Sequence, residues 1–353
     1  MLLLARCVAE SGCKKGTETV PCFHPNQAVQ DYPGAKPRFT NYELSCHSQM
    51  QGALWLPCGQ CWWCRLNRAT QWAVRCMHEK QMTTDHEFIT LTFNDAHLPK
   101  DWSLDRRYWQ LFMKRVRKLY GKGPRYFGCG EYGDNLGRPH FHAIMFNFPL
   151  KDKKPIFSQG GRTYYTSETL QRLWSDSAGP IGYVMTTGVS FASAQYVARY
   201  VTKKMTGKKS RAHYRVMICA TGEIVELQPE FPMCSTDPGI GSSWFDKYGL
   251  TDLFPKDFCT VQTSDGAFRV AVPRYYMKKL EKVSPDLYIS MKARRLERAK
   301  ELAPDNTPER LLAKEKEVLA KARERLLSEA GRKFGGSYEL KSLQYLRCEE
   351  LGL

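Results

Sequence analysis

The chain has 353 residues, and its 53 Lys and Arg outnumber its 36 Asp and Glu to give a formal net charge of +17. This charge predicts a polyanionic partner, for which we expect nucleic acid, with an acidic membrane surface as the alternative. An aromatic content of 12% favours nucleic acid, because bases stack on aromatic rings. No apolar run reaches the roughly 18 residues of a membrane-spanning helix or resembles a signal peptide, so we expect a protein outside the membrane.

Residues 1–83 are a cysteine-rich N-terminal region. Its first 50 residues predict irregular structure, and apolar spacing predicts a helix from residue 65 to about residue 83. The whole chain contains 13 cysteines. Because no secretory signal precedes them, we expect a reducing compartment, in which disulfides are rare. Metal binding or burial then accounts for most of these thiols.

Three of the cysteines, Cys58, Cys61 and Cys64, recur at every third position directly before the predicted helix. Thiolates at this spacing can share one zinc ion, which needs four ligands. We take Cys46 as the fourth ligand of a structural Zn²⁺ site. The alternative fourth ligands are His47, Cys7, Cys13 and Cys22. The same thiols could instead be reduced and partly buried without any metal.

Residues 84–210 alternate strands with helices. A run of β-branched and aromatic residues at 88–93 predicts a strand, and an amphipathic pattern at 104–120 predicts a helix. There follow predicted strands at 125–132 and 140–148 joined by a turn, a polar loop, a helix at 166–175, a strand at 182–187 and a helix at 191–205. This order favours an α+β fold in which helices flank a central antiparallel sheet.

The rest of the chain carries weaker signals. Residues 211–283 predict short strands and loops, an irregular β and loop region. Residues 284–353 predict a basic, mainly helical C-terminal extension with a break near 304–308, where two prolines lie. We expect this extension to bind a macromolecular partner or to be a solvated helical appendage.

A pair of histidines in the strand at 140–148 forms the first candidate site. His140 and His142 share one face of that strand, because side chains alternate along it. Glu131 lies in the preceding strand, and a hairpin with a short turn brings its carboxylate beside both imidazoles. Two imidazoles and a carboxylate can hold a divalent ion and leave positions open for water and a phosphate oxygen. The alternative is a pair of partly buried histidines without a metal.

Two tyrosines in the helix at 191–205 form the second candidate site. Tyr196 and Tyr200 are four residues apart, so their phenols lie on one helix face. A phenol oxygen can attack a phosphodiester and form a covalent intermediate, and a metal ion that polarises the phosphate assists it. Lys203 and Lys204 follow, and we assign them to the same catalytic site as phosphate-binding or charge-neutralising groups. The alternative is ordinary aromatic core packing.

Basic residues near these sites are the candidate DNA contacts. Phosphate contacts supply much of the affinity of proteins for DNA, so clustered Lys and Arg side chains suit this role. The alternative is solvated surface charge. The residues that we select for DNA binding are Arg138, Arg199, Lys114, Arg115 and Lys118.

Five stretches between about residue 57 and residue 205 carry a resemblance to a known family. They are Pro57-Cys58-Gly59-Gln60-Cys61, Phe88-Ile89-Thr90-Leu91-Thr92-Phe93, Gly130-Glu131-Tyr132-Gly133, Gly137-Arg138-Pro139-His140-Phe141-His142-Ala143-Ile144 and Tyr196-Val197-Ala198-Arg199-Tyr200-Val201-Thr202-Lys203-Lys204. In this order they resemble the rolling-circle replication initiators of the HUH endonuclease superfamily, particularly those of gokushovirus-type phages of the Microviridae. The later Pro238-Gly239-Ile240-Gly241 and Pro273-Arg274-Tyr275-Tyr276 are similar to the same phage proteins.

The resemblance implies an HUH endonuclease domain with the histidines on a central strand and with Mg²⁺ or Mn²⁺ as the ion. It implies that the protein nicks the viral strand at the replication origin through a tyrosine and stays joined to the 5′ phosphate. A host polymerase would extend the 3′ hydroxyl, and a second cut would allow religation of the genome. Single-stranded and origin DNA, host replication proteins such as a helicase and a polymerase, and the cytoplasm of an infected bacterium are the implied partners and location.

Two other functions fit part of the pattern. A non-catalytic, zinc-containing nucleic-acid-binding protein would explain the charge and the cysteines but would leave Glu131, His140 and His142 without a role. A metal-dependent phosphodiesterase that activates water would keep the metal site and would need neither tyrosine. Only a tyrosine-dependent nickase gives every one of these groups a task.

Overall fold

The computed structural model describes residues 22–29, 36–39, 53–99, 101–133, 137–203, 210–217, 222–263 and 266–334. The chain forms two compact units. We call the unit of residues 69–267 and 272–276 the sheet unit. The terminal unit comprises the described residues within 1–68, 268–271 and 277–353.

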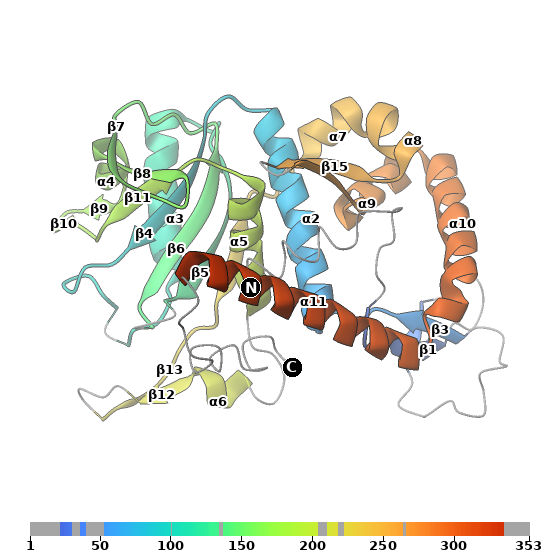
Figure 1. Ribbon diagram of the computed structural model, residues 1–353. Coiled ribbons are helices and arrows are strands. Elements are labelled where there is room, and N and C mark those ends of the chain that lie inside the picture. The colour runs from blue at the N-terminus through green and yellow to red at the C-terminus, as the bar shows by residue number, and fades with distance from the viewer. Residues whose placement is uncertain are drawn as a thin grey trace. The chain divides into compact units, whose positions relative to one another are not determined.

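The sheet unit is built on one antiparallel sheet of seven strands, in the order β14, β5, β6, β4, β11, β8 and β7 (Figure 1). The strands are β4 (His86–Thr92), β5 (Arg125–Tyr132), β6 (Pro139–Phe146), β7 (Lys153–Gln159), β8 (Arg162–Ser167), β11 (Val184–Thr187) and β14 (Phe231–Cys234). β6 is an interior strand that pairs with β5 on one side and with β4 on the other. The predicted antiparallel sheet is confirmed.

One face of the sheet carries α3 (Arg106–Tyr120) and α4 (Glu168–Leu173). α3 begins where the Asp105 side chain accepts a hydrogen bond from the backbone N–H of its second residue, an N-cap that satisfies one of the unpaired donors of the first turn. Its buried side chains join Phe141 and Trp174 in one aromatic-rich core. The odd-numbered residues of β6 therefore face α3.

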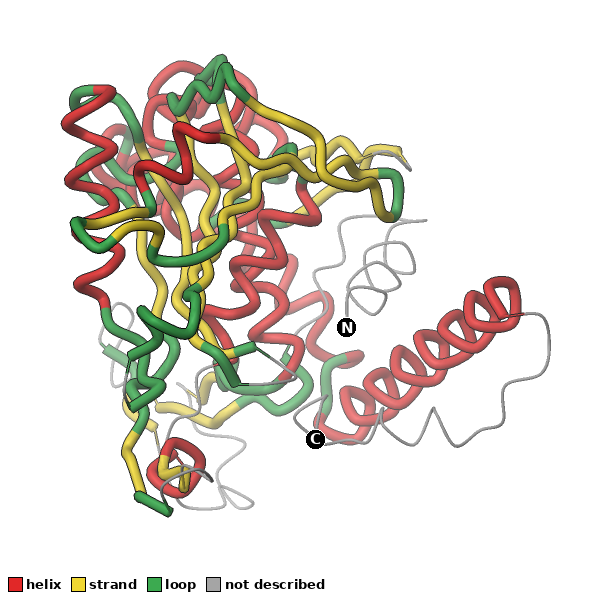
Figure 2. Tube along the Cα trace, turned by 90° about the vertical axis from the view of Figure 1, so that its left-hand side faces the viewer, coloured by secondary structure: helices red, strands yellow, loops and turns green. Residues whose placement is uncertain are grey.

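The opposite face carries α5 (Phe191–Lys203) and the part of α2 (Trp62–Gln81) from Ala69 onward. These helices pack on Ile144 and Phe146 of β6, so the even-numbered residues of this strand face α5. Figure 2 shows the strands as a layer with helices on both sides. The side chains of the candidate histidines consequently point to the face that α5 covers.

The other elements of the sheet unit are short. They are β9 (Ser175–Asp176), β10 (Gly179–Pro180), α6 (Ser210–Tyr214), β12 (Arg215–Met217), β13 (Ile224–Glu226), α7 (Ser242–Tyr248), η1 (Gly249–Leu253), α8 (Phe254–Lys256) and β15 (Cys259–Thr263). Two further elements, β16 (Gly266–Val270) and α9 (Arg274–Val283), follow in the chain.

The terminal unit combines a small sheet with long helices. β1 (Asn26–Val29) pairs with both β2 (Arg38–Phe39) and β3 (Ala53–Leu56). The helices α10 (Pro285–Leu302) and α11 (Pro308–Phe334) are separated by the short turn η2 (Ala303–Asp305), which confirms the predicted break. Within the described part of the chain, no helix is both long enough and apolar enough to span a bilayer.

The structure contains strands where the sequence predicted none. β7 and β8 occupy the expected polar loop before α4, and all seven residues of β7 are exposed, so the strand has no alternating pattern to detect. β14 lies in the region expected to hold short strands and loops, but its place in the main sheet was not predicted, because its partner β5 lies far away in the chain. β1 and β2 likewise lie in the stretch that was expected to be irregular.

Candidate functional site

Glu131, His140 and His142 come together on the face of the sheet that α5 covers. In the β5–β6 hairpin Glu131 stands directly opposite His140, as the sequence predicted. The carboxylate Oε1 lies 2.8 Å from Nε2 of His140 and 3.0 Å from Nε2 of His142. All three groups thus direct one ligand atom each to a common point.

The remaining ring nitrogens are held by neighbours. Nδ1 of His140 donates to the carbonyl of Arg138 over 3.0 Å, which fixes the tautomer whose Nε2 carries a lone pair. Nδ1 of His142 lies 2.9 Å from Oγ1 of Thr90 on the neighbouring strand. Such outer contacts are the usual way in which proteins orient histidine ligands toward a metal. Thr90 was not selected from the sequence, since nothing in a strand pattern marks it.

The geometry fits a divalent ion. Ligands in neighbouring octahedral positions, each about 2.1 Å from Mg²⁺, are about 3.0 Å apart, and the separations of 2.8 and 3.0 Å agree. Oε2 of Glu131 is buried and has no hydrogen-bond partner among the described residues. Burying an unpaired carboxylate oxygen is unfavourable, and a bound cation would remove this penalty. Burial lowers the pKa of His142 in spite of the nearby Glu131 carboxylate, so this imidazole is neutral and able to ligate.

α5 places Tyr196 beside this cluster. The ring of Tyr196 is half-buried and lies edge-on to His142, with 5.5 Å between the ring centroids. The guanidinium of Arg199, three residues on, lies 5.8 Å from the centre of the Tyr196 ring. The structure therefore brings together Tyr196, Arg199 and the three candidate metal ligands.

The other predicted catalytic residues are only partly described. Tyr200 and Lys203 lie on the same helix as Tyr196, one and about two turns further along. Lys204 lies outside the described residues. The role of this second half of the motif stays a prediction.

The predicted DNA contacts divide into two groups. Arg138 lies near the cluster, where it forms an ion pair of 2.7 Å with Asp95 and donates to the carbonyl of Phe93. Lys114, Arg115 and Lys118 lie on α3, which covers the opposite face of the sheet from the histidines. Arg115 also donates to the carbonyl of Leu173, and burial lowers the pKa of Arg115. The structure does not bring the α3 residues to the carboxylate–histidine cluster.

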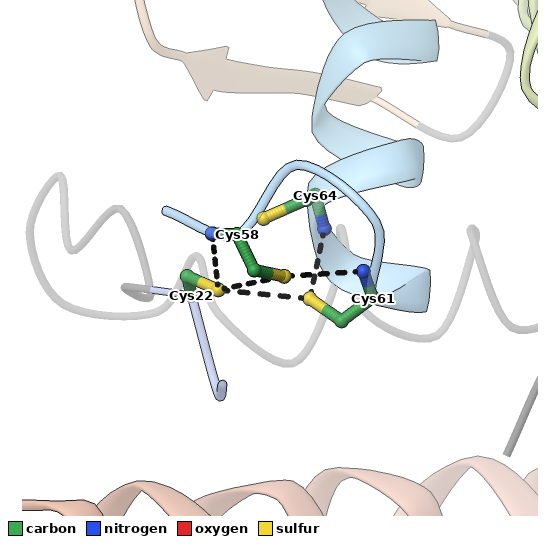
Figure 3. A group of neighbouring side chains, drawn as sticks. All are labelled: Cys22, Cys58, Cys61 and Cys64. Atoms are coloured by element: carbon green, nitrogen blue, oxygen red, sulfur yellow. Dashed lines mark hydrogen bonds between the residues drawn. The ribbon is translucent and has the colours of Figure 1, made fainter. Parts of the chain in front are cut away.

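The terminal unit contains a second candidate metal centre. Cys22, Cys58, Cys61 and Cys64 direct their sulfurs toward one another, with all four sulfurs within 4.8 Å (Figure 3). Cys58 and Cys61 precede α2, Cys64 lies in its first turn, and Cys22 comes from a separate segment. The expected fourth ligand, Cys46, lies outside the described residues, and Cys22 stands with the other three instead.

Backbone amides support the sulfurs. The N–H of Cys61 donates to Sγ of Cys58 over 3.3 Å, and the N–H of Cys58 donates to Sγ of Cys22 over 3.3 Å. A hydrogen bond from the Cys64 side chain lowers the pKa of Cys61 to about 4, whereas burial raises the pKa of Cys22 to about 11. A cation bound between the sulfurs would stabilise their thiolate forms.

Comparison with known proteins places these sites in context. Residues 86–205 match the model of a protein family whose description is replication-associated protein ORF2. The matched residues include Glu131, His140, His142 and Tyr196. The chain is 33% identical over 259 residues to the replication-associated protein VP4 of Bdellovibrio phage phiMH2K, and the match covers 70% of this chain and 74% of that protein. It is 32% identical over 278 residues to the replication-associated protein ORF2 of Spiroplasma virus 4, and this match covers 74% of this chain and 80% of that protein.

A third relative matches a shorter part of the chain. The replication-associated protein ORF4 of Chlamydia phage 1 is 33% identical over 167 residues, which cover 45% of this chain and 40% of that protein. No solved structure matches the chain significantly. The sequence relatives and the site geometry are therefore the two independent guides to function.

Proposed function

The chain belongs to the family of phage replication-associated proteins, and on that premise we propose that it is an HUH-type initiator endonuclease that nicks origin DNA through a tyrosine. The observation that carries this proposal is the position of Tyr196. Its ring lies edge-on to His142, next to a carboxylate and two imidazoles whose spacing suits a divalent ion. A nucleophile and an electrophile-activating site thus lie side by side.

The proposed reaction is a transesterification. The phenol oxygen of Tyr196 bonds to the phosphorus of the scissile phosphate, and the bond from phosphorus to the 3′ oxygen breaks. The phenol loses its proton and the departing 3′ oxygen gains one, so the DNA ends in a 3′ hydroxyl and a 5′ phosphotyrosine. Mg²⁺ or Mn²⁺ held by Glu131, His140 and His142 would polarise the phosphate. Arg199 supplies positive charge beside the phenol that loses its proton.

The later steps follow from the same chemistry. One phosphodiester replaces another, so the first cut is close to energy-neutral and can run in reverse, which permits religation. We assign the second cut to Tyr200, and neutralisation of the phosphate to Lys203 and Lys204. A host polymerase would extend the 3′ hydroxyl and a host helicase would open the duplex, which requires action in the cytoplasm of the infected cell.

One experiment tests the reaction against its alternatives. The protein is incubated with Mn²⁺ and a 3′-labelled single-stranded oligonucleotide that carries the phage origin, so that the fragment joined to tyrosine keeps the label, and the products are separated on a denaturing protein gel. We expect a covalent adduct that persists in Tyr164→Phe, a control on β8, and disappears in the Tyr196→Phe, Tyr200→Phe double variant. Cleavage without an adduct in the double variant would show a water-dependent phosphodiesterase, and no cleavage by the unaltered protein would leave only a binding function.

The cysteine cluster has a separate proposed role as a structural Zn²⁺ site. Four sulfurs at tetrahedral positions about 2.3 Å from zinc are about 3.8 Å apart, and Sγ of Cys22 lies 3.5 Å from that of Cys58 and 3.7 Å from that of Cys61. Four protein ligands leave no position for a substrate, so such an ion would stabilise the fold rather than take part in nicking.

A further inference from the structure

Tyr183, directly before β11, is unusual for its exposure. Its side chain is 76% exposed, more than any other large hydrophobic residue among those described. An exposed aromatic ring offers a flat face on which a nucleic-acid base can stack. The site described above does not use this ring, and the sequence patterns did not mark it.

The backbone that carries this ring is held firmly. The N–H of Thr92 donates to the carbonyl of Tyr183 over 3.0 Å, and the N–H of Tyr183 donates to Oγ1 of Thr92 over 3.2 Å. At Gly182 a Cβ would lie 2.0 Å from the carbonyl oxygen of Thr92, so only glycine permits this close approach. The exposed ring therefore stands on a fixed base, which reduces the entropy lost when a ligand stacks on it.

The sheet register connects Tyr183 to the candidate metal ligands. Thr92 pairs with His140, and His140 pairs with Glu131. The bond from Thr92 to Tyr183 extends this row by one strand, and Val184, the next residue, points into the core on the α3 face. Tyr183 thus faces the same side as the histidines, two strands and about 10 Å from His140.

A hollow lies beside Tyr183 and extends to Arg138, two residues before His140. It is lined by Thr92, Phe93, Asn94, Asp95, Arg138 and Tyr183. Its one basic side chain, Arg138, forms an ion pair with Asp95, whose side chain is 93% exposed. Its lining combines an aromatic ring with a guanidinium, two groups with which proteins commonly bind single-stranded nucleic acid.

We propose that Tyr183 is a stacking platform for a base of the single DNA strand whose scissile phosphate lies at Glu131, His140 and His142. This inference rests on the proposed nicking function. A strand that runs along the row of paired residues would place one base on the Tyr183 ring and a neighbouring phosphate near Arg138. Because every base has an aromatic face, we expect stacking here to strengthen binding with little preference for one base.

Binding of a fluorescein-labelled, mixed-sequence single-stranded oligonucleotide tests the platform. Dissociation constants are measured at one salt concentration without added Mg²⁺ or Mn²⁺, so that no cleavage is required. We expect Tyr183→Ala to bind about ten-fold more weakly, the loss of one stacked base, and Tyr183→Phe to bind as the unaltered protein does. Phe157→Ala is the matched control, an exposed aromatic residue on the edge strand β7, and should bind normally.

A second readout detects stacking itself. Oligonucleotides with 2-aminopurine at successive positions around the nick should show one position whose fluorescence is quenched on binding to the unaltered protein and to Tyr183→Phe, but not to Tyr183→Ala. Equal affinities for Tyr183→Ala and the unaltered protein would overturn the platform and leave the tyrosine adduct of Tyr196 untouched. No binding of single-stranded DNA by the unaltered protein would overturn both proposals.

Discussion

The two candidate metal centres differ in how many ligands they have and in what holds those ligands. Glu131, His140 and His142 provide three ligand atoms from two adjacent strands of one hairpin, within a buried sheet. The cysteine centre provides four sulfurs, and one of them comes from a segment 36 residues away from the next. Three ligands leave room for a substrate, whereas four close the site. The number of ligands therefore agrees with the reactive role that we propose for the first centre and the structural role that we propose for the second.

The structure that holds the ligands also differs between the two centres. The hairpin of β5 and β6 is fixed by sheet pairing, with or without an ion. The residues near Cys22 are held by side-chain contacts instead: the ring of Phe23 lies 5.3 Å from that of Trp62, and Glu315 of α11 accepts from Trp62 and pairs with His24. Removing a ligand should therefore abolish chemistry at the first centre and reduce stability at the second.

The largest expected effect is on nicking. Glu131→Gln removes a charged ligand and keeps the shape, so we expect the rate of nicking to fall by roughly a thousand-fold, the equivalent of about 4 kcal/mol of charge stabilisation by a metal. Glu87→Gln is the matched control, a buried carboxylate on β4 that pairs with Lys153 and Thr186. It should lower the thermal midpoint and leave the rate unchanged. A Glu131→Gln protein that nicks at the normal rate would remove the carboxylate from the proposed site.

The next effect concerns stability. Cys22→Ser should lower the free energy of unfolding by about 3 kcal/mol, roughly a quarter of the binding free energy of a structural zinc ion. Metal analysis of the purified protein should give one zinc per chain, and less than one for this variant. Cys234→Ser, a half-buried cysteine outside the cluster, should retain the zinc and lose less stability. Equal zinc content and equal stability in both variants would show that the cysteines are ordinary buried thiols.

These two centres also show how far a sequence can be read. Glu131 was found because a hairpin links residues that are close in the chain, and a turn of known length fixes which residues face each other. Cys22 could not be selected over Cys46, because the approach of residue 22 to α2 depends on the packing of Phe23, Trp62 and Glu315. Residue spacing predicts which residues pair within a hairpin, but it does not predict which distant segments pack together.

The same limit applied to the fold. β5 was predicted with its observed bounds, since it is a compact run of strand-forming residues between two turns. β14 has only four residues, and its partner β5 lies about 100 residues earlier in the chain. Tyr183 was not selected for a related reason, because its proposed role depends on a cross-strand row that only the register reveals.

A moderate effect of pH on the free energy of unfolding is expected. It arises from His78 in the sheet unit and not from the cysteine centre. Burial lowers the pKa of His78 from 6.5 to about 3, and its ring stacks on Trp244 with Nδ1 2.9 Å from the Tyr276 hydroxyl. In the unfolded chain His78 takes up a proton more readily than in the folded protein. The neutral His78 therefore contributes its full stabilisation above about pH 6.5, and this stabilisation is lost as the pH falls toward 3. Between pH 6.5 and 5 we expect the free energy of unfolding to fall by about 2 kcal/mol.

Chemical denaturation at a series of pH values measures this loss. His78→Phe keeps a ring against Trp244 and cannot titrate, so its stability should change less over the same pH interval. The Cys22→Ser protein, whose His78 is unaltered, should keep the full pH dependence. Identical curves for His78→Phe and the unaltered protein would show that another group is responsible.

The smallest expected effect tests whether the carboxylate–histidine centre is open to a DNA strand on its Arg138 side. Asp95→Asn removes the exposed partner of Arg138. Because exposed ion pairs are worth at most about 1 kcal/mol, freeing this guanidinium for a phosphate should strengthen binding of single-stranded DNA by about two- to five-fold. The affinity for single-stranded DNA should also depend more steeply on salt concentration, by the amount expected for about one more phosphate contact. Asp85→Asn removes the same charge at the opposite end of β4, so an equal gain there would mean that net charge, and not Arg138, determines the affinity.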